Sequence, residues 1–121
     1  MSCLFNSLAP AVNLHPEVLR KAIAAYLKTD PELLDNVKAT DVVEWTEGST
    51  LEEYADRMSQ SGTWGGAIEI KAFCELFDMD VTVHVIYTGK EFTVESSKTP
   101  LRIVHINYTG NHFESMYIEL V

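Results

Sequence analysis

The sequence predicts a single α+β domain over residues 1–121, and three observations support this class. The chain length is that of one ordinary domain. Apolar residues recur at helical spacing in the first two-thirds of the chain and alternate as in strands in the last third. Helices that precede a set of strands, rather than alternating with them, favour helices packed around a small, mostly antiparallel sheet.

The N-terminal part of the chain is expected to be helical. A short apolar segment begins at Cys3 and is expected to enter a helix over residues 4–8. Pro16 and Glu17 suit the first turn of a second helix, because proline needs no N–H there and an acid faces the positive end of the helix dipole. Apolar residues at helical spacing extend this helix to about Lys28.

The pattern is less regular in the next segment. Asp30 is the expected N-cap of a short helix over residues 32–37. Residues 38–49 are interpreted as a loop or a short turn of helix. Thr50, followed three residues later by Glu53, fits the capping box of another helix that runs to about residue 60.

The period of the apolar residues changes near Asp78. Before it, a turn-rich break over residues 61–66 is followed by helical spacing over residues 67–77. After it, apolar residues alternate with polar ones, which is typical of half-buried strands. Four strands are expected, over residues 81–87, 91–95, 101–108 and 116–121.

Composition and charge argue against several classes of protein. The formal net charge of −9 argues against nucleic acid and against an anionic membrane surface as partners, because both require a basic face. No apolar run reaches the length of a membrane span, and no secretory signal is recognised. We therefore expect a monomer in the cytoplasm, or in the host cytoplasm if the source is a virus or a bacterial effector.

A cysteine and a histidine at opposite ends of the sequence are the candidate catalytic pair. A cysteine nucleophile reacts as the thiolate, which a helix N-terminus and a nearby protonated histidine both favour. Cys3 lies where a helix can begin, and His112 lies on a turn that leads into the last strand. Glu114 would point to the same side as His112 in an extended segment and could orient its ring. Each residue taken alone is more often structural than catalytic.

The remaining candidate groups are interpreted as structural. His15 precedes a helix, and His84 and His105 are strand side chains. Cys74 is expected to be a packed core thiol beside Phe73. No Cys and His pair has zinc-ligand spacing, and no phosphate-binding glycine loop occurs. We therefore expect neither a metal nor a cofactor.

Three motifs mark the start, the middle and the end of the chain: Met1-Ser2-Cys3-Leu4-Phe5, the unbroken block Thr63–Ile70, and Gly110–Glu114. Together they resemble the OTU (ovarian-tumour) family of papain-like cysteine proteases, which cleave ubiquitin from proteins and from ubiquitin chains. Within that family the likeness is greatest to the yeast and animal deubiquitinases that serve the endoplasmic-reticulum degradation ATPase. The resemblance covers essentially the whole chain and implies a papain-like fold.

The resemblance implies a role for each catalytic candidate. Cys3 would be the nucleophile and His112 the general base, with Glu114 where the family usually has Asp or Asn. The implied reaction is hydrolysis of the isopeptide bond between the C-terminal glycine of ubiquitin and a lysine, through a thioester. Two alternatives stay open: an inactive or weak module that still binds ubiquitin, and a cysteine protease for another ubiquitin-like modifier.

The resemblance also implies a substrate-binding set. Trp64, Gly65 and Gly66 match the loop that lines the channel for the ubiquitin tail, whose terminal Gly-Gly requires a narrow slot. The backbone of both glycines could approach an extended peptide closely, while Trp64 could equally be a core anchor. Phe113, where tyrosine is usual, and Asn111 complete the set beside the histidine. A neighbouring acid, Glu69, could meet an arginine of the tail, but a solvated helix face is the favoured interpretation.

Two further features bear on function. The family normally has an Asp two or three residues before the cysteine, in a loop whose N–H groups stabilise the oxyanion. Because the sequence starts at Met1, we expect this loop to be absent or cut short. The chain would then be a trimmed domain, an enzyme whose oxyanion hole is built from other groups, or a weak or inactive enzyme.

Nine acids between Asp30 and Asp56 suit a basic partner such as ubiquitin, although a merely soluble acidic surface is an equal alternative.

Overall fold

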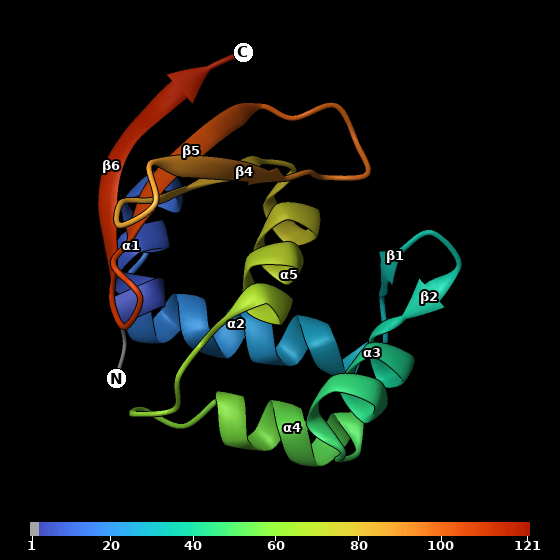
Figure 1. The fold of residues 1–121 in the computed structure, drawn as a ribbon. Coiled ribbons are helices and arrows are strands. Elements are labelled where there is room, and N and C mark those ends of the chain that lie inside the picture. The colour runs from blue at the N-terminus through green and yellow to red at the C-terminus, as the bar shows by residue number, and fades with distance from the viewer. Residues whose placement is uncertain (1–2) are drawn as a thin grey trace.

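The computed structural model describes residues 3–121, in which five helices accompany a four-stranded sheet and a small hairpin (Figure 1). This arrangement confirms the α+β prediction. None of these helices combines the length and the apolar character that crossing a membrane requires. The elements are α1 (Cys3–Val12), α2 (Pro16–Lys28), β1 (Glu32–Leu34), β2 (Val37–Lys38), α3 (Ala39–Glu47), α4 (Leu51–Met58), α5 (Ala67–Phe77), β3 (Asp80–Val85), β4 (Lys90–Val94), β5 (Arg102–Tyr108) and β6 (Phe113–Leu120).

Helix α2 is the central helix of the domain and has the predicted bounds. The ring Nδ1 of His15 accepts a hydrogen bond from the backbone N–H of Glu17 at 3.2 Å, so His15 is the N-cap. The helix contacts α1, α4 and α5, and Figure 1 shows it crossing beneath α5. Its apolar face, Leu19, Ile23 and Leu27, is fully buried in the core.

The prediction of a short helix over residues 32–37 is wrong. Strands β1 and β2 form a hairpin there, with Asn36 in the left-handed backbone region at φ 61° in the turn. Asp30 is therefore not the N-cap of a helix, and the N-cap of α3 is Lys38. Asp30 Oδ1 instead accepts from the backbone N–H of Thr40, in the first turn of α3, at 2.9 Å. Because this hydrogen bond acts across an intervening hairpin, local sequence patterns do not reveal it.

Helix α3 replaces most of the loop expected over residues 38–49, and it ends at Gly48, whose φ of 66° suits glycine. The next two helices were predicted correctly. Thr50 Oγ1 accepts from the backbone N–H of Glu53 at 3.2 Å and begins α4, and α5 has the predicted bounds.

The four predicted strands are present, in the order β4-β3-β5-β6. Two of the three pairings are antiparallel and β3–β5 is parallel, so the mostly antiparallel sheet is confirmed. The last strand begins earlier than predicted, because Phe113 already pairs with Tyr108. Helix α5 contacts β3 and β4, and α1 contacts β5 and β6. Buried residues on the sheet, Val81, Val83, Val104 and Ile106, belong to the core that these helices share.

A row of polar side chains crosses all four strands on the outer face of the sheet. His84 Nδ1 lies 3.0 Å from a carboxylate oxygen of Glu91, and His84 Nε2 lies 2.9 Å from His105 Nδ1. His105 Nε2 lies 2.8 Å from a carboxylate oxygen of Glu119. The ring of Tyr117 stacks on His105 with centroids 4.2 Å apart. His84 and His105 are therefore the structural strand residues that the sequence predicted.

Candidate active site

The candidate nucleophile Cys3 lies in the first turn of α1, which is longer than the helix predicted over residues 4–8. The apolar face of the helix holds this turn against the core, where Leu4 and Phe5 are buried. The Ser7 hydroxyl donates to the backbone oxygen of Cys3 at 2.7 Å. Cys3 itself is only 5% exposed. Met1 and Ser2, and with them the prediction about an oxyanion loop before Cys3, lie outside the described residues.

Helix α1 and strand β6 run side by side in the same direction. The Ser115 hydroxyl donates to the backbone oxygen of Ser7 at 2.9 Å, and further along the two elements Ala11 and Ile118 line a common small cavity. Going back from this hydrogen bond, the helix reaches residue 3 in about 6 Å and the strand reaches residue 112 in about 10 Å. The candidate nucleophile and base therefore share one end of the domain, where Figure 1 shows the β5–β6 turn beside the start of α1.

The turn before β6 is held by its own hydrogen bonds. The backbone N–H of Thr109 donates to the backbone oxygen of His112 at 2.9 Å, and the Tyr108 hydroxyl donates to the backbone oxygen of Gly110 at 2.7 Å. Gly110 has a φ of 105°, which residues with a Cβ rarely adopt. These contacts fix where the His112 backbone enters the strand.

His112 and Glu114 face each other as predicted. His112 Nε2 lies 3.8 Å from Glu114 Oε1, and both side chains are about half exposed. The separation of these two atoms is too long for a hydrogen bond. The contact uses Nε2 and so leaves Nδ1 of the same ring for another partner. Within residues 3–121, no hydrogen bond joins His112 to Cys3.

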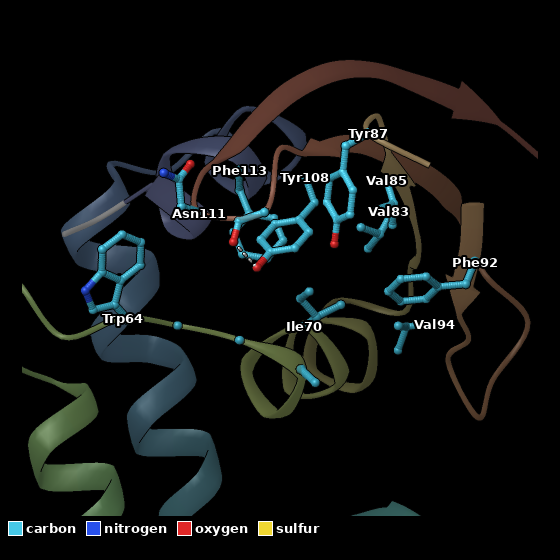
Figure 2. A pocket seen from close by; sticks show the side chains of 14 residues that line it. Trp64, Ile70, Val83, Val85, Tyr87, Phe92, Val94, Tyr108, Asn111 and Phe113 are labelled. Carbon is cyan, nitrogen blue, oxygen red and sulfur yellow. Dashed lines mark hydrogen bonds between the residues drawn. The ribbon is translucent and has the colours of Figure 1, made fainter. Parts of the chain in front are cut away.

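A cleft of about 660 Å³ opens between α5, the sheet and the segment before α5. Figure 2 shows Trp64 and Asn111 at one end of it and Phe92 and Val94 at the other. All five predicted substrate-binding residues line this cleft, and the Trp64 side chain is 54% exposed, so its interpretation as a core anchor is wrong. The lining is Trp64, Gly65, Gly66, Ala67, Ile70, Val83, Val85, Tyr87, Phe92, Val94, Tyr108, Gly110, Asn111 and Phe113.

Several lining residues were not predicted from the sequence. Val83, Phe92 and Tyr108 face the helices from three neighbouring strands, at positions paired across the sheet or two residues further along. These residues alternate with outward-facing ones along the predicted strands, and this alternation could have identified them as inward-facing. That they line an open cleft instead of packing under α5 depends on how the helix sits on the sheet, which alternation in the sequence does not show.

Gly65 packs against the residues that follow the candidate nucleophile. A Cβ at this position would lie 2.8 Å from Leu4 Cδ2 and 3.1 Å from Phe5 Cε2, closer than side chains tolerate. A Cβ on Gly66 would meet nothing within 4 Å. A side chain at position 65 would therefore force Leu4, and to a smaller extent Phe5, to shift. Close approach of either glycine to an extended peptide stays a prediction.

The interpretation of Glu69 as a solvated helix residue is wrong. Glu69 is 1% exposed. Its Oε2 accepts from the Tyr54 hydroxyl at 2.5 Å, and its Oε1 accepts from the backbone N–H of Gly66 at 2.7 Å. Burial raises the pKa of Glu69 to about 7, and burial together with the nearby carboxylate raises the pKa of Tyr54. The sequence could not reveal this environment, because Tyr54 comes from a different helix.

The raised pKa of Glu69 predicts a pH-dependent stability. Between pH 4.5 and about 7 the folded protein keeps the Glu69 proton that the unfolded chain has lost. The free energy of unfolding should therefore fall as pH rises through this window, by about 3 kcal/mol at most from this group. Urea unfolding at pH 5 and pH 8 should show Glu69→Gln gaining stability relative to wild type at the higher pH. An equal difference between the two proteins at both pH values would contradict the prediction.

The second cysteine is a core residue, as predicted. Cys74 is fully buried, and its Sγ lies 3.4 Å from the backbone oxygen of Val94. Burial raises the pKa of the Cys74 thiol to about 12, so it is inert as a nucleophile at neutral pH. Over the part of the chain that the structure describes, no three His, Cys, Asp or Glu side chains are grouped as a metal site requires.

Comparison with known proteins gives a consistent result. Proteins of Rattus norvegicus and Mus musculus, each named ubiquitin thioesterase OTU1, are 29% identical over 121 and 118 residues, respectively. These matches cover 95% of this chain and 33% of each relative, so the chain spans about a third of the length of these relatives.

The fold and the family model agree with these relatives. A solved ovarian-tumour (OTU) domain in complex with ubiquitin has a TM-score of 0.78 at 20% identity, over 97% of this chain and 64% of that chain. This likeness shows the fold. The model of the OTU-like cysteine protease family matches residues 2–117, nearly the whole sequence. The chain thus belongs to the OTU-like cysteine protease family.

Proposed function

We propose that this domain is a deubiquitinase that hydrolyses the isopeptide bond between the C-terminal glycine of ubiquitin and a lysine. The observation that carries the proposal is that Gly65, which lines the apolar cleft, packs against Leu4 and Phe5 directly after Cys3, while Asn111 and Phe113, on either side of His112, line the same cleft. Cys3 and His112 themselves are not among the residues that line it. The names of the relatives support ubiquitin as the substrate, as does the OTU domain solved with ubiquitin.

The proposed reaction uses Cys3 and His112 in turn. The Cys3 thiolate attacks the carbonyl carbon of the terminal glycine, and His112 gives its proton to the lysine amine as the C–N bond breaks. A water molecule then loses a proton to His112 and attacks the thioester, which releases the ubiquitin carboxylate and the Cys3 thiol. Glu114, near Nε2, would orient the ring and direct Nδ1 toward the sulfur.

A ubiquitin probe with a C-terminal electrophile tests this function. We expect wild type and Cys74→Ala to be labelled covalently, and Cys3→Ala to be neither labelled nor active on ubiquitin–lysine isopeptides. The Cys74→Ala variant is the matched control because it removes the other, buried thiol. Absence of labelling in wild type, or labelling that persists in Cys3→Ala, would contradict the proposal.

A non-catalytic ubiquitin-binding module is the second candidate. The long 3.8 Å separation of His112 Nε2 from Glu114 favours it, because the ring is less firmly oriented than a hydrogen bond would make it. Ubiquitin binding without any probe labelling would identify this function. Labelling only by the probe of another ubiquitin-like modifier would instead identify a protease for that modifier.

Charge is expected to assist the encounter with a basic partner. Helices α3 and α4 carry exposed acids, among them Glu44, Glu47, Glu52 and Glu53. Opposite charge raises association rates, and salt screens this attraction beyond about 10 Å at 0.1 M. We therefore expect the association rate constant for ubiquitin, measured by stopped-flow with Cys3→Ala, to fall from low to high ionic strength. A rate constant independent of salt would remove this role for the acidic surface.

A further inference from the structure

The segment Trp64–Ala67 is a wall with space on both sides. One face lines the 660 Å³ cleft described above. The other lines a second cavity of about 250 Å³, which Thr46, Tyr54 and Glu69 complete. On these two sides the segment lacks the close packing that normally immobilises a chain. Its position must therefore depend on a small number of specific contacts.

Two hydrogen bonds hold Gly66 at the centre of the wall: its backbone oxygen accepts from the backbone N–H of Ile70 at 3.0 Å, and its own N–H donates to a side chain. Of the backbone N–H groups at positions 64 to 66, only that of Gly66 donates a hydrogen bond within residues 3–121, and its acceptor is Glu69 Oε1. The other carboxyl oxygen of Glu69 accepts from Tyr54, which is 6% exposed on α4. The wall is therefore tied through one buried carboxyl group to a different helix.

The wall packs against α1, the helix that carries Cys3. Gly65, next to the N–H that Glu69 binds, lies so close to Leu4 and Phe5 that a Cβ would force their side chains to shift. Trp64, the next residue, lies at the end of the cleft near Asn111 (Figure 2). A shift of the wall would thus change both the packing beside Cys3 and the shape of the cleft mouth.

We propose that Glu69 is a positioning residue of the active site, which holds the Trp64–Ala67 wall at the correct distance from the start of α1. This inference rests on the proposed function and deepens it. The role needs two acceptor or donor atoms at the carboxyl position rather than a negative charge. Glutamine supplies them, since its oxygen can accept from Gly66 while its amide donates to the Tyr54 oxygen.

The alternative is that Glu69 only stabilises the N-terminus of α5. Loss of a helix cap typically costs about 1 kcal/mol of stability. Such a loss would lower the free energy of unfolding but leave the kinetics of the folded molecules unchanged. A displaced wall would instead change kcat/KM for folded enzyme, and small misplacements of substrate-positioning groups can cost about 100-fold.

The matched control is another acid of α5. Glu75 also accepts from a backbone N–H, that of Ser97 at 3.1 Å, and from a hydroxyl, Ser97 Oγ at 2.7 Å. It does not line the cleft or the second cavity. Glu75→Ala therefore removes a similar pair of hydrogen bonds from the same helix, together with the ion pair to Lys71 at 3.1 Å, without touching the wall.

The test compares Glu69→Ala, Glu69→Gln and Glu75→Ala at a temperature where all are folded. We expect Glu69→Ala to lower kcat/KM on a ubiquitin–lysine isopeptide by about 10- to 100-fold and to speed amide hydrogen exchange of Gly66. Glu69→Gln should restore both, and Glu75→Ala should change neither. Unchanged kcat/KM in Glu69→Ala would overturn the proposal even if Gly66 exchange is faster, because loss of the helix cap alone gives that result. A loss of kcat/KM that Glu69→Gln does not restore would also overturn it.

Two further measurements keep the outcomes distinct. If wild type does not hydrolyse ubiquitin, the proposed function fails. The positioning role is then decided by two rates: amide exchange of Gly66 and alkylation of Cys3 by iodoacetamide. Glu69→Ala must change both rates. If Glu69→Ala does not fold, Tyr54→Phe takes its place in these measurements. Tyr54→Phe must speed amide exchange of Gly66, but by less than expected for Glu69→Ala. A Gly66 exchange rate equal to that of wild type would overturn the proposal.

Discussion

His112→Ala is expected to lower turnover of a ubiquitin–lysine isopeptide by about 10²- to 10⁴-fold, the usual contribution of a general acid–base group. The variant loses both the group that protonates the departing amine and the base that activates water. The side chain is half exposed and lies outside the core, so its removal should leave the free energy of unfolding nearly unchanged. Steady-state kinetics with purified protein, together with urea unfolding, measure both effects.

His15→Ala provides the control for this prediction. His15 caps α2 and contributes one hydrogen bond to Glu17, so its loss should affect stability and not turnover. Glu114→Gln should cost less activity than His112→Ala, because the contact of Glu114 with the ring is long and solvent-exposed. Full turnover in His112→Ala would show that another group is the base.

Phe5→Ala is expected to reduce the free energy of unfolding by about 3–5 kcal/mol. Phe5 is fully buried, the backbone of Gly65 packs against its ring, and the Arg20 guanidinium carbon lies 4.4 Å from the ring centroid. The substitution leaves a cavity and removes this cation–π contact. Because Phe5 lies two residues after Cys3 and beneath the wall, activity should fall as well. Chemical denaturation at one pH, followed by kinetics on the folded fraction, separates the two losses.

Phe92→Ala is the matched control for stability. It removes the same atoms from a side chain that is 53% exposed on β4, so we expect a change of about 0.5 kcal/mol or less. If the two variants lost similar stability, the placement of Phe5 in the core would be wrong.

Local sequence patterns were sufficient for most of the secondary structure. The bounds of α2 and α5 follow from helical spacing and their first-turn residues, and Thr50 marks the start of α4. The patterns failed over residues 32–47, where a hairpin and a helix stand in place of a helix and a loop. The determining contact there, from Asp30 to Thr40, crosses ten positions and so lies beyond a local pattern.

The candidate site shows the same division. Three motifs were enough to nominate the catalytic candidates and the five residues that line the cleft. The volume and apolar character of that cleft depend on strand positions left uncovered by α5, which is a property of packing. The roles of Cys3, His112 and Glu114 stay predictions that the kinetic experiments decide.

The sequence by itself determined the fold class, the family and the separation of the two cysteines into a core thiol and a candidate nucleophile. These follow from periodicity and from residue type in contiguous motifs. Only the tertiary structure decided that Glu69 is buried, that Trp64 is exposed and that Gly65 packs against Leu4 and Phe5. The physical reason is that burial and hydrogen-bond partners are supplied by segments distant in the chain, here Tyr54 on α4 and Leu4 on α1.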